Sequence, residues 1–138
     1  MGVLVHRRGL ELDVDDWTNL DALTGRNLSM RLFNAPTLQP FDANLADFSE
    51  AVFTGYAPIN FTTAANVPKV LGANLYQTKL KNAAFVWVCT AAPETIYGWF
   101  LLDSADGTVI FSEVWATPEV LEVGTRITQN VDLQIVQG

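Results

Sequence analysis

The fold is decided by residues 96–115, IYGWFLLDSADGTVIFSEVW. Both halves of this stretch are rich in β-branched and aromatic residues, which are favoured in strands. Asp106 and Gly107 supply turn chemistry at its centre, because glycine adopts a positive φ without steric cost. We therefore predict a β-hairpin, in which Asp103 and Asp106 bracket the turn and form local hydrogen bonds.

Two further stretches alternate between apolar and polar residues, which is typical of strands with two different faces. Residues 28–33 direct Leu28, Met30 and Leu32 to one face and Phe33 to the other. Residues 126–135 predict a terminal strand with one solvated face. Its apolar face carries Ile127, Val131, Leu133 and Ile135.

The region between these strands is less regular. Residues 83–89, AAFVWVC, are apolar on both faces, which favours a central strand covered on each side and ended by Pro93. Residues 62–77 contain Pro68 and Gly72, so we expect a long connection there, with at most a single helical turn. Residues 120–124 are expected to lead into a turn.

Helical signals are confined to residues 16–24, where acidic residues precede apolar residues at helical spacing. The sequence as a whole predicts an all-β fold. We expect an antiparallel β-sandwich or jelly-roll-like barrel of about eight strands, with an extended N-terminal arm and at most one short helix. Residues 1–26 would form the arm and the helical turn, and residues 27–138 the sandwich, in one compact domain.

Composition narrows the function classes. The 138 residues include 8 Lys+Arg and 15 Asp+Glu, which gives a net charge of −7 and argues against nucleic acid as a partner. No apolar run approaches the roughly 20 residues that span a bilayer, and the charges at the N-terminus follow the apolar stretch, the reverse of a signal peptide. We therefore expect neither a membrane partner nor secretion by that route.

The chain is unusually apolar, with 49% hydrophobic and 17% charged residues. Either the core is very well filled, or surface patches are covered by partner chains. We favour the second interpretation, because the many aromatic residues are of the kind enriched at the centres of interfaces. An obligate homo-oligomer would satisfy this composition.

Candidate catalytic and metal-binding patterns are weak. The single histidine, His6, and the single cysteine, Cys89, lack neighbours at metal-ligand spacing, and Cys89 lies in an apolar run typical of an inert core thiol. Nucleophile-elbow and phosphate-loop motifs are missing, and the acidic run at residues 13–16 fits a solvated face. The carboxylate pairs Asp47/Glu50 and Asp103/Asp106 leave glycosidase activity as an alternative, because such an enzyme needs two carboxylates on either side of the sugar bond. We expect no catalytic, cofactor-binding or metal-binding residues.

The aromatic residues allow two interpretations. They could form a stacking platform for sugar rings, or they could fill the core and subunit interfaces, which is the commoner role at strand spacing. The residues concerned are Trp17, Tyr97, Trp87, Trp99 and Trp115.

The N-terminal segment, residues 3–12, has strand-like composition and the only compact basic cluster. It fits a solvated edge strand protected by charge, or an arm that adds to the sheet edge of a neighbouring subunit. The candidate partner-contacting residues are Val3, Val5, His6, Arg7, Arg8, Leu10 and Trp17.

Three stretches together resemble a group of small proteins found among the structural genes of tailed bacteriophages. They are NLSMRLFN at 27–34, LADFSEAVFTGYA at 45–57, and TIYGWFLLD at 95–103 leading into IFSE at 110–113. The middle block is the most specific of the three. The resemblance spans most of residues 27–135.

This resemblance implies a non-enzymatic virion component and transfers no catalytic residues. A capsid decoration (cement) protein would bind the major capsid protein as a homotrimer on the capsid surface, after synthesis in the host cytoplasm. A tail, fibre or adaptor component would contact other virion proteins. A carbohydrate-binding β-sandwich module or an enzyme is the remaining alternative.

Overall fold

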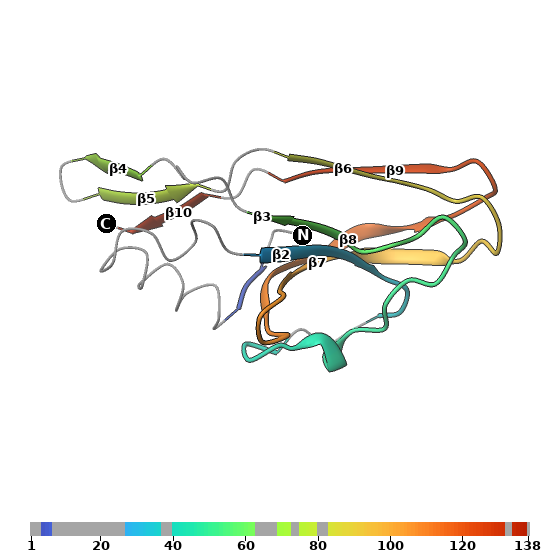
Figure 1. The fold of residues 1–138 in the computed structure, drawn as a ribbon, viewed down its shortest axis with the longest axis horizontal. Coiled ribbons are helices and arrows are strands. Elements are labelled where there is room, and N and C mark those ends of the chain that lie inside the picture. The colour runs from blue at the N-terminus through green and yellow to red at the C-terminus, as the bar shows by residue number, and fades with distance from the viewer. Residues whose placement is uncertain are drawn as a thin grey trace.

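The computed structural model describes residues 4–6, 27–36, 40–62, 69–72, 75–79, 83–131 and 134–137. Within these ranges the chain is all-β and its strand pairs are antiparallel, as the sequence predicts (Figure 1). The elements are β1 (Leu4–Val5), β2 (Asn27–Phe33), the 3-10 helix η1 (Leu45–Asp47), β3 (Ile59–Thr62), β4 (Lys69–Gly72), β5 (Leu75–Lys79), β6 (Ala83–Val88), β7 (Thr95–Asp103), β8 (Val109–Val120), β9 (Arg126–Val131) and β10 (Gln134–Gln137).

The strands form a large sheet and two smaller ones. The large sheet has the order β1-β8-β7-β2-β3, and β6 pairs with β9 in a two-stranded ribbon. Figure 1 shows this ribbon lying across the large sheet as a second layer, with the β10-β5-β4 sheet beyond one end of it. The architecture is therefore a β-sandwich.

The core lies on both faces of the large sheet, because β2 and β7 carry apolar side chains on both sides. Between the two layers, Leu28, Met30 and Leu32 of β2 pack in one cluster with Phe85 and Trp87 of β6. On the other face, residues near η1 cover the sheet in a second cluster, which comprises Phe33, Ala43, Phe48, Phe100, Leu102 and Val109. The alternation predicted for residues 28–33 is confirmed.

The predicted hairpin is β7 and β8, in register at Gly98↔Val114 and Leu101↔Phe111. The backbone N–H of Gly107 donates to the Asp103 carbonyl at 2.9 Å, and Gly107 has a φ of 74°. The carboxylate of Asp106 accepts a bond from the Thr108 N–H at 3.1 Å. Both aspartates therefore serve the turn, and the predicted hairpin chemistry is confirmed.

Three sequence-based expectations are wrong. Residues 62–77 are not one long connection, because they contain β4 and most of β5, which pair in register at Gly72↔Leu75. Glycine at the end of a strand does not prevent pairing, and Val70, Tyr76 and Thr78 are residue types that favour strands. Because β4 and β5 are present, the described residues form ten strands, more than the expected number of about eight.

The second error concerns residues 126–135, which form two strands. Strand β9 pairs with β6, whereas β10 pairs with β5 in another sheet. The alternation continues across both strands and gives no sign that the pairing partner changes.

The third concerns residues 83–89, which are not covered on both faces. Phe85, Trp87 and Cys89 are buried, but Val86 points outward with 40% of its surface exposed. Among the described strands, β6 pairs with β9 alone. Valine suits a solvated strand face through its β-branching, so an apolar residue there did not mean burial.

Residues 4–6 belong to the large sheet. Strand β1 pairs with β8 at Leu4↔Ser112 and Val5↔Phe111. This part of the expected arm is therefore an edge strand of its own chain's sheet. The helix expected at residues 16–24 and the acidic run at 13–16 lie outside the described residues. No helix among the described residues is long and apolar enough to cross a membrane.

Candidate functional site

The most specific block of the sequence, residues 45–57, contributes η1 and most of a segment that joins the two layers. We call residues 48–58 the strap. Beside the end of β2, the Ala51 N–H donates to the Leu32 carbonyl at 3.0 Å. Further along, the Thr90 N–H donates to the Thr54 carbonyl at 2.8 Å, just beyond the end of β6. The strap thus spans from the large sheet to the ribbon.

Three apolar residues of the strap, Phe48, Ala51 and Phe53, are buried in the core. Phe48 stacks on Phe100 with ring centroids 4.3 Å apart, below the large sheet. Ala51 and Phe53 are buried in the cluster between the layers. Gly55 has a φ of 100°, and a Cβ there would lie 2.0 Å from the Val88 carbonyl oxygen. Only glycine fits this crossing.

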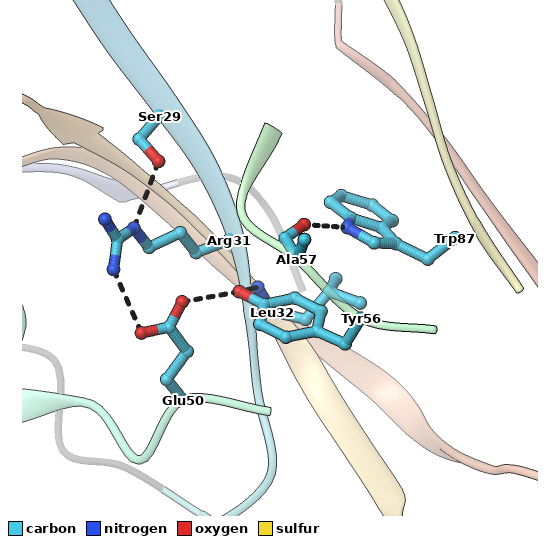
Figure 2. Close-up of polar contacts among 7 residues, drawn as sticks. All are labelled: Ser29, Arg31, Leu32, Glu50, Tyr56, Ala57 and Trp87. Carbon is cyan, nitrogen blue, oxygen red and sulfur yellow. Dashed lines mark hydrogen bonds and ion pairs between the residues drawn. The ribbon is translucent and has the colours of Figure 1, made fainter. Parts of the chain in front are cut away.

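A polar network fixes the strap to β2 (Figure 2). The Arg31 Nη1 lies 3.0 Å from Glu50 Oε2, and the Arg31 Nε donates to Ser29 Oγ at 3.0 Å. The Tyr56 hydroxyl donates to the other Glu50 oxygen, Oε1, at 2.7 Å. Both oxygens of the Glu50 carboxylate are therefore bonded, one to the sheet and one within the strap.

Burial raises the pKa of the Tyr56 hydroxyl, and the hydrogen bond to Glu50 raises it further. The hydroxyl therefore stays protonated and donates to the carboxylate. It also accepts a long bond from the Leu32 N–H, at 3.4 Å. Beside it, the Trp87 indole N–H donates to the Ala57 carbonyl at 2.8 Å, which ties the strap to β6 (Figure 2).

Glu94 connects the strap to the loops next to it. Its Oε1 accepts the N–H groups of Val52 at 2.6 Å and Phe53 at 3.0 Å, and its Oε2 accepts from Asn34 Nδ2 at 2.8 Å. The Glu94 backbone carbonyl accepts the Leu121 N–H at 3.0 Å. One residue therefore joins three loops and the end of β2.

His6 is buried within its own chain, with 1% of its surface exposed. Its Nδ1 donates to the Pro40 carbonyl at 2.7 Å, because a carbonyl can only accept. In the neutral ring, Nε2 then accepts from the Ser112 hydroxyl at 2.6 Å. Burial lowers the pKa of His6, and the Pro40 carbonyl and the Asp47 charge oppose this.

The structure brings few of the expected partner-contacting residues together. Val5 is paired with Phe111 through β1, and His6 forms contacts inside the chain. Val3, Arg7, Arg8, Leu10 and Trp17 lie outside the described residues, so partner contact through them stays a prediction.

The described aromatic candidates lie in the core and do not form an exposed platform. Trp87 and Trp99 are 3% and 1% exposed, and Trp115 and Tyr97 pack against the two clusters. The Trp99 indole N–H donates to Glu113 Oε1 at 3.0 Å. Cys89 is a buried free thiol, as the sequence predicts.

The candidate carboxylates serve local structure. Asp47 accepts the Asn44 N–H at 2.9 Å in the capping box of η1, while Glu50 holds the strap. Among the described residues, no group of three or more His, Cys, Asp or Glu side chains is placed to hold a metal ion.

Sequence reasoning missed Arg31, Glu50, Tyr56 and Glu94 as the residues that organise the loops. One signal pointed to Arg31, because a long charged side chain within a strand of core residues requires a partner. No spacing rule connects it to Glu50, 19 residues away, or Asn34 to Glu94, 60 residues away. Comparison with known proteins finds no match among protein families, curated proteins or solved structures.

Proposed function

We propose that the chain is a non-enzymatic structural protein of a tailed-phage virion, which binds the major capsid protein and decorates the capsid surface. The observation that carries this proposal is the role of residues 45–57, on which the resemblance to such proteins rests. Phe48, Glu50, Phe53, Gly55 and Tyr56 all hold the strap in place. Residues that depend on one another structurally are what proteins of the same fold would share.

The use of polar groups supports a structural role. Arg31, Glu50, Tyr56, Glu94 and His6 all bond to other parts of the fold. Their hydrogen bonds join strands and loops that are far apart in the sequence, which rigidifies a binding scaffold.

A decoration protein acts by mass action, because a ligand that binds only the assembled shell raises the stability of that shell. The net charge of −7 suits the outside of a shell, away from packaged DNA. The apolar composition favours an oligomer as the bound form, and the resemblance to decoration proteins implies a homotrimer.

The copy number in purified virions tests the proposal. Quantitative mass spectrometry would measure this protein against the major capsid protein. We expect about one copy per capsid subunit, as for a protein that follows the capsid lattice. A few copies per particle would instead favour a tail, fibre or adaptor component, and absence from the particle would contradict both virion roles.

The oligomeric state is tested separately, by light scattering at micromolar concentration. We expect three times the 15.2 kDa mass of one chain. A mass of one chain would contradict the trimer without contradicting a role as a monomeric decoration protein.

A further inference from the structure

Three loops meet at the end of the molecule on the right of Figure 1, where the turns after β6 and β8 lie beside the strap. We call this surface the loop end and define it by Val52, residues 91–93 and residues 119–124, which comprise the last two residues of β8 and the loop after them. All three loops lie within the described residues.

The loop end exposes large apolar side chains. Val52 is 77% exposed, Val120 70% and Val123 67%, and they are the three most exposed large hydrophobic residues of the described chain. Ala91, Ala92 and Pro93 are also exposed. Single exposed valines are ordinary, but a group on two adjoining loops and the strand end beside them marks an interaction surface.

These valines are held in place by anchored neighbours. The Val52 N–H donates to Glu94 Oε1 at 2.6 Å. Leu121, which follows Val120, donates its N–H to the Glu94 carbonyl at 3.0 Å, and Gly124, which follows Val123, donates to the Cys89 carbonyl at 2.7 Å. A surface that is rigid before binding loses less entropy when it docks.

The backbone at Ala92 supports the same conclusion. Ala92 has a φ of 50°, in the left-handed region that is strained for residues with a Cβ. The Thr54 N–H holds the preceding Ala91 carbonyl at 3.0 Å. Strained backbone of this kind persists where the surrounding contacts define it, and it is concentrated at binding sites.

The charge around the valines indicates what kind of partner fits. Glu119, near the end of β8, and Glu122, in the loop that follows, are both exposed, and Arg126 at the start of β9 is the nearest described cation along the chain. A second copy docked face to face would bring these glutamates toward their own counterparts, which disfavours self-association here. A partner with basic side chains around an apolar hollow would match both features.

We propose that the loop end is the surface by which the chain docks on its shell partner, and that the partner presents an apolar hollow bordered by lysine or arginine. This inference rests on the proposed function and assigns it a surface. Exposed valines supply the apolar contact, and the two glutamates supply orientation and part of the association rate.

The test uses the full chain and shells assembled from the major capsid protein of the same phage. Val52→Ser, Val120→Ser and Val123→Ser are combined in one variant, and co-sedimentation measures its affinity. We expect binding at least about tenfold weaker than the unmodified chain, as for the loss of central interface contacts. Val86→Ser and Phe41→Ser, at exposed apolar positions away from the loop end, are matched controls that should bind normally.

A second variant, Glu119→Lys with Glu122→Lys, tests the charge. We expect weaker binding at low salt and a smaller difference at high salt, because salt screens exposed charges. Normal binding of this variant at low salt would contradict the proposal that lysine or arginine side chains border the hollow of the partner.

The outcomes separate the two proposals. If the unmodified chain fails to sediment with the shells, the proposed function is contradicted. If it sediments and the triple serine variant sediments equally well, the proposed function stands and the loop end is overturned. If the triple variant has a lower oligomer mass by light scattering, the surface is a contact between copies, which also overturns the proposal.

Discussion

Tyr56 shows how one side chain can hold two layers together. Its hydroxyl donates to Glu50, whose other oxygen binds Arg31, and its ring packs 6.4 Å from that of Trp87. The Glu50 side chain is about a quarter exposed, at 27%, so solvent weakens the ion pair with Arg31. The hydrogen bond from Tyr56, which is more sheltered, is therefore the better target for substitution.

We expect Tyr56→Phe to lower the free energy of unfolding by about 1–2 kcal/mol, because Glu50 Oε1 loses its donor while the ring remains. Urea unfolding would measure this change in the free energy of unfolding, in a double-mutant cycle that also includes Glu50→Gln. A coupling of about 0.5 kcal/mol or more is expected for residues in one network. Glu122→Gln, at an exposed carboxylate, is the control, and additive effects of the two substitutions would contradict the network.

His6 gives the stability of the fold a dependence on pH. Burial lowers its pKa in the folded chain below the ordinary value of 6.5. The unfolded chain therefore binds the proton at a higher pH than the folded chain does, and protonation favours unfolding. We expect stability to be full above pH 6.5 and to fall as the pH drops from there toward the folded pKa.

Urea midpoints between pH 7.5 and 5.5 would show this decrease, in a range above the ordinary pKa of carboxylates. His6→Gln removes the chain's only imidazole, so the variant should be less stable at pH 7.5 but should lack the additional loss. An equal loss in both proteins would assign the pH dependence to other groups.

At the scale of elements, the strap depends on the close approach of Gly55 to Val88. A Cβ at Gly55 would lie 2.0 Å from a backbone oxygen, in addition to the strain of a φ of 100°. Gly107 has a φ of 74° but no atom within 4 Å of the place of its Cβ. A substitution at Gly107 therefore tests the cost of the positive φ alone, whereas one at Gly55 tests that cost together with a steric clash.

We expect Gly107→Ala to cost about 1 kcal/mol, the ordinary penalty of the left-handed region. Gly55→Ala should cost about 3 kcal/mol or more, because either the strap or the end of β6 must move. Thermal unfolding of both variants gives the comparison. Similar losses for the two would mean that the strap yields easily at this crossing.

The same elements show what the sequence could and could not predict. The β7–β8 hairpin was predictable because its turn chemistry lies within four residues of both strand ends. Glu94 binds the backbone of Val52 and Phe53, which lie 42 and 41 positions before it in the sequence, and local sequence patterns do not encode contacts at such separations. Residues 126–135 keep one apolar–polar alternation although β9 pairs with β6 and β10 pairs with β5. The periodicity therefore predicted that these residues form strand, but not which sheet each part joins.

At the scale of the whole molecule, the N-terminal residues complete one edge of the large sheet. Strand β1 pairs with β8, the His6 N–H donates to the Ile110 carbonyl at 3.0 Å, and the His6 ring connects Ser112 to Pro40. An unpaired sheet edge is a site for association with other chains. These first residues therefore contribute to stability and also protect part of the edge.

We expect a chain that lacks residues 1–6 to lose about 2–4 kcal/mol of stability, since the buried Ser112 hydroxyl and the Pro40 carbonyl lose a partner and a buried ring is removed. A chain that lacks residues 1–3 alone retains Leu4–His6 and serves as the control. Chemical unfolding measures stability, and light scattering measures association through the uncovered part of β8. If both truncated chains unfold like the full chain, β1 is dispensable, and the N-terminal segment is free to act as an arm toward a partner.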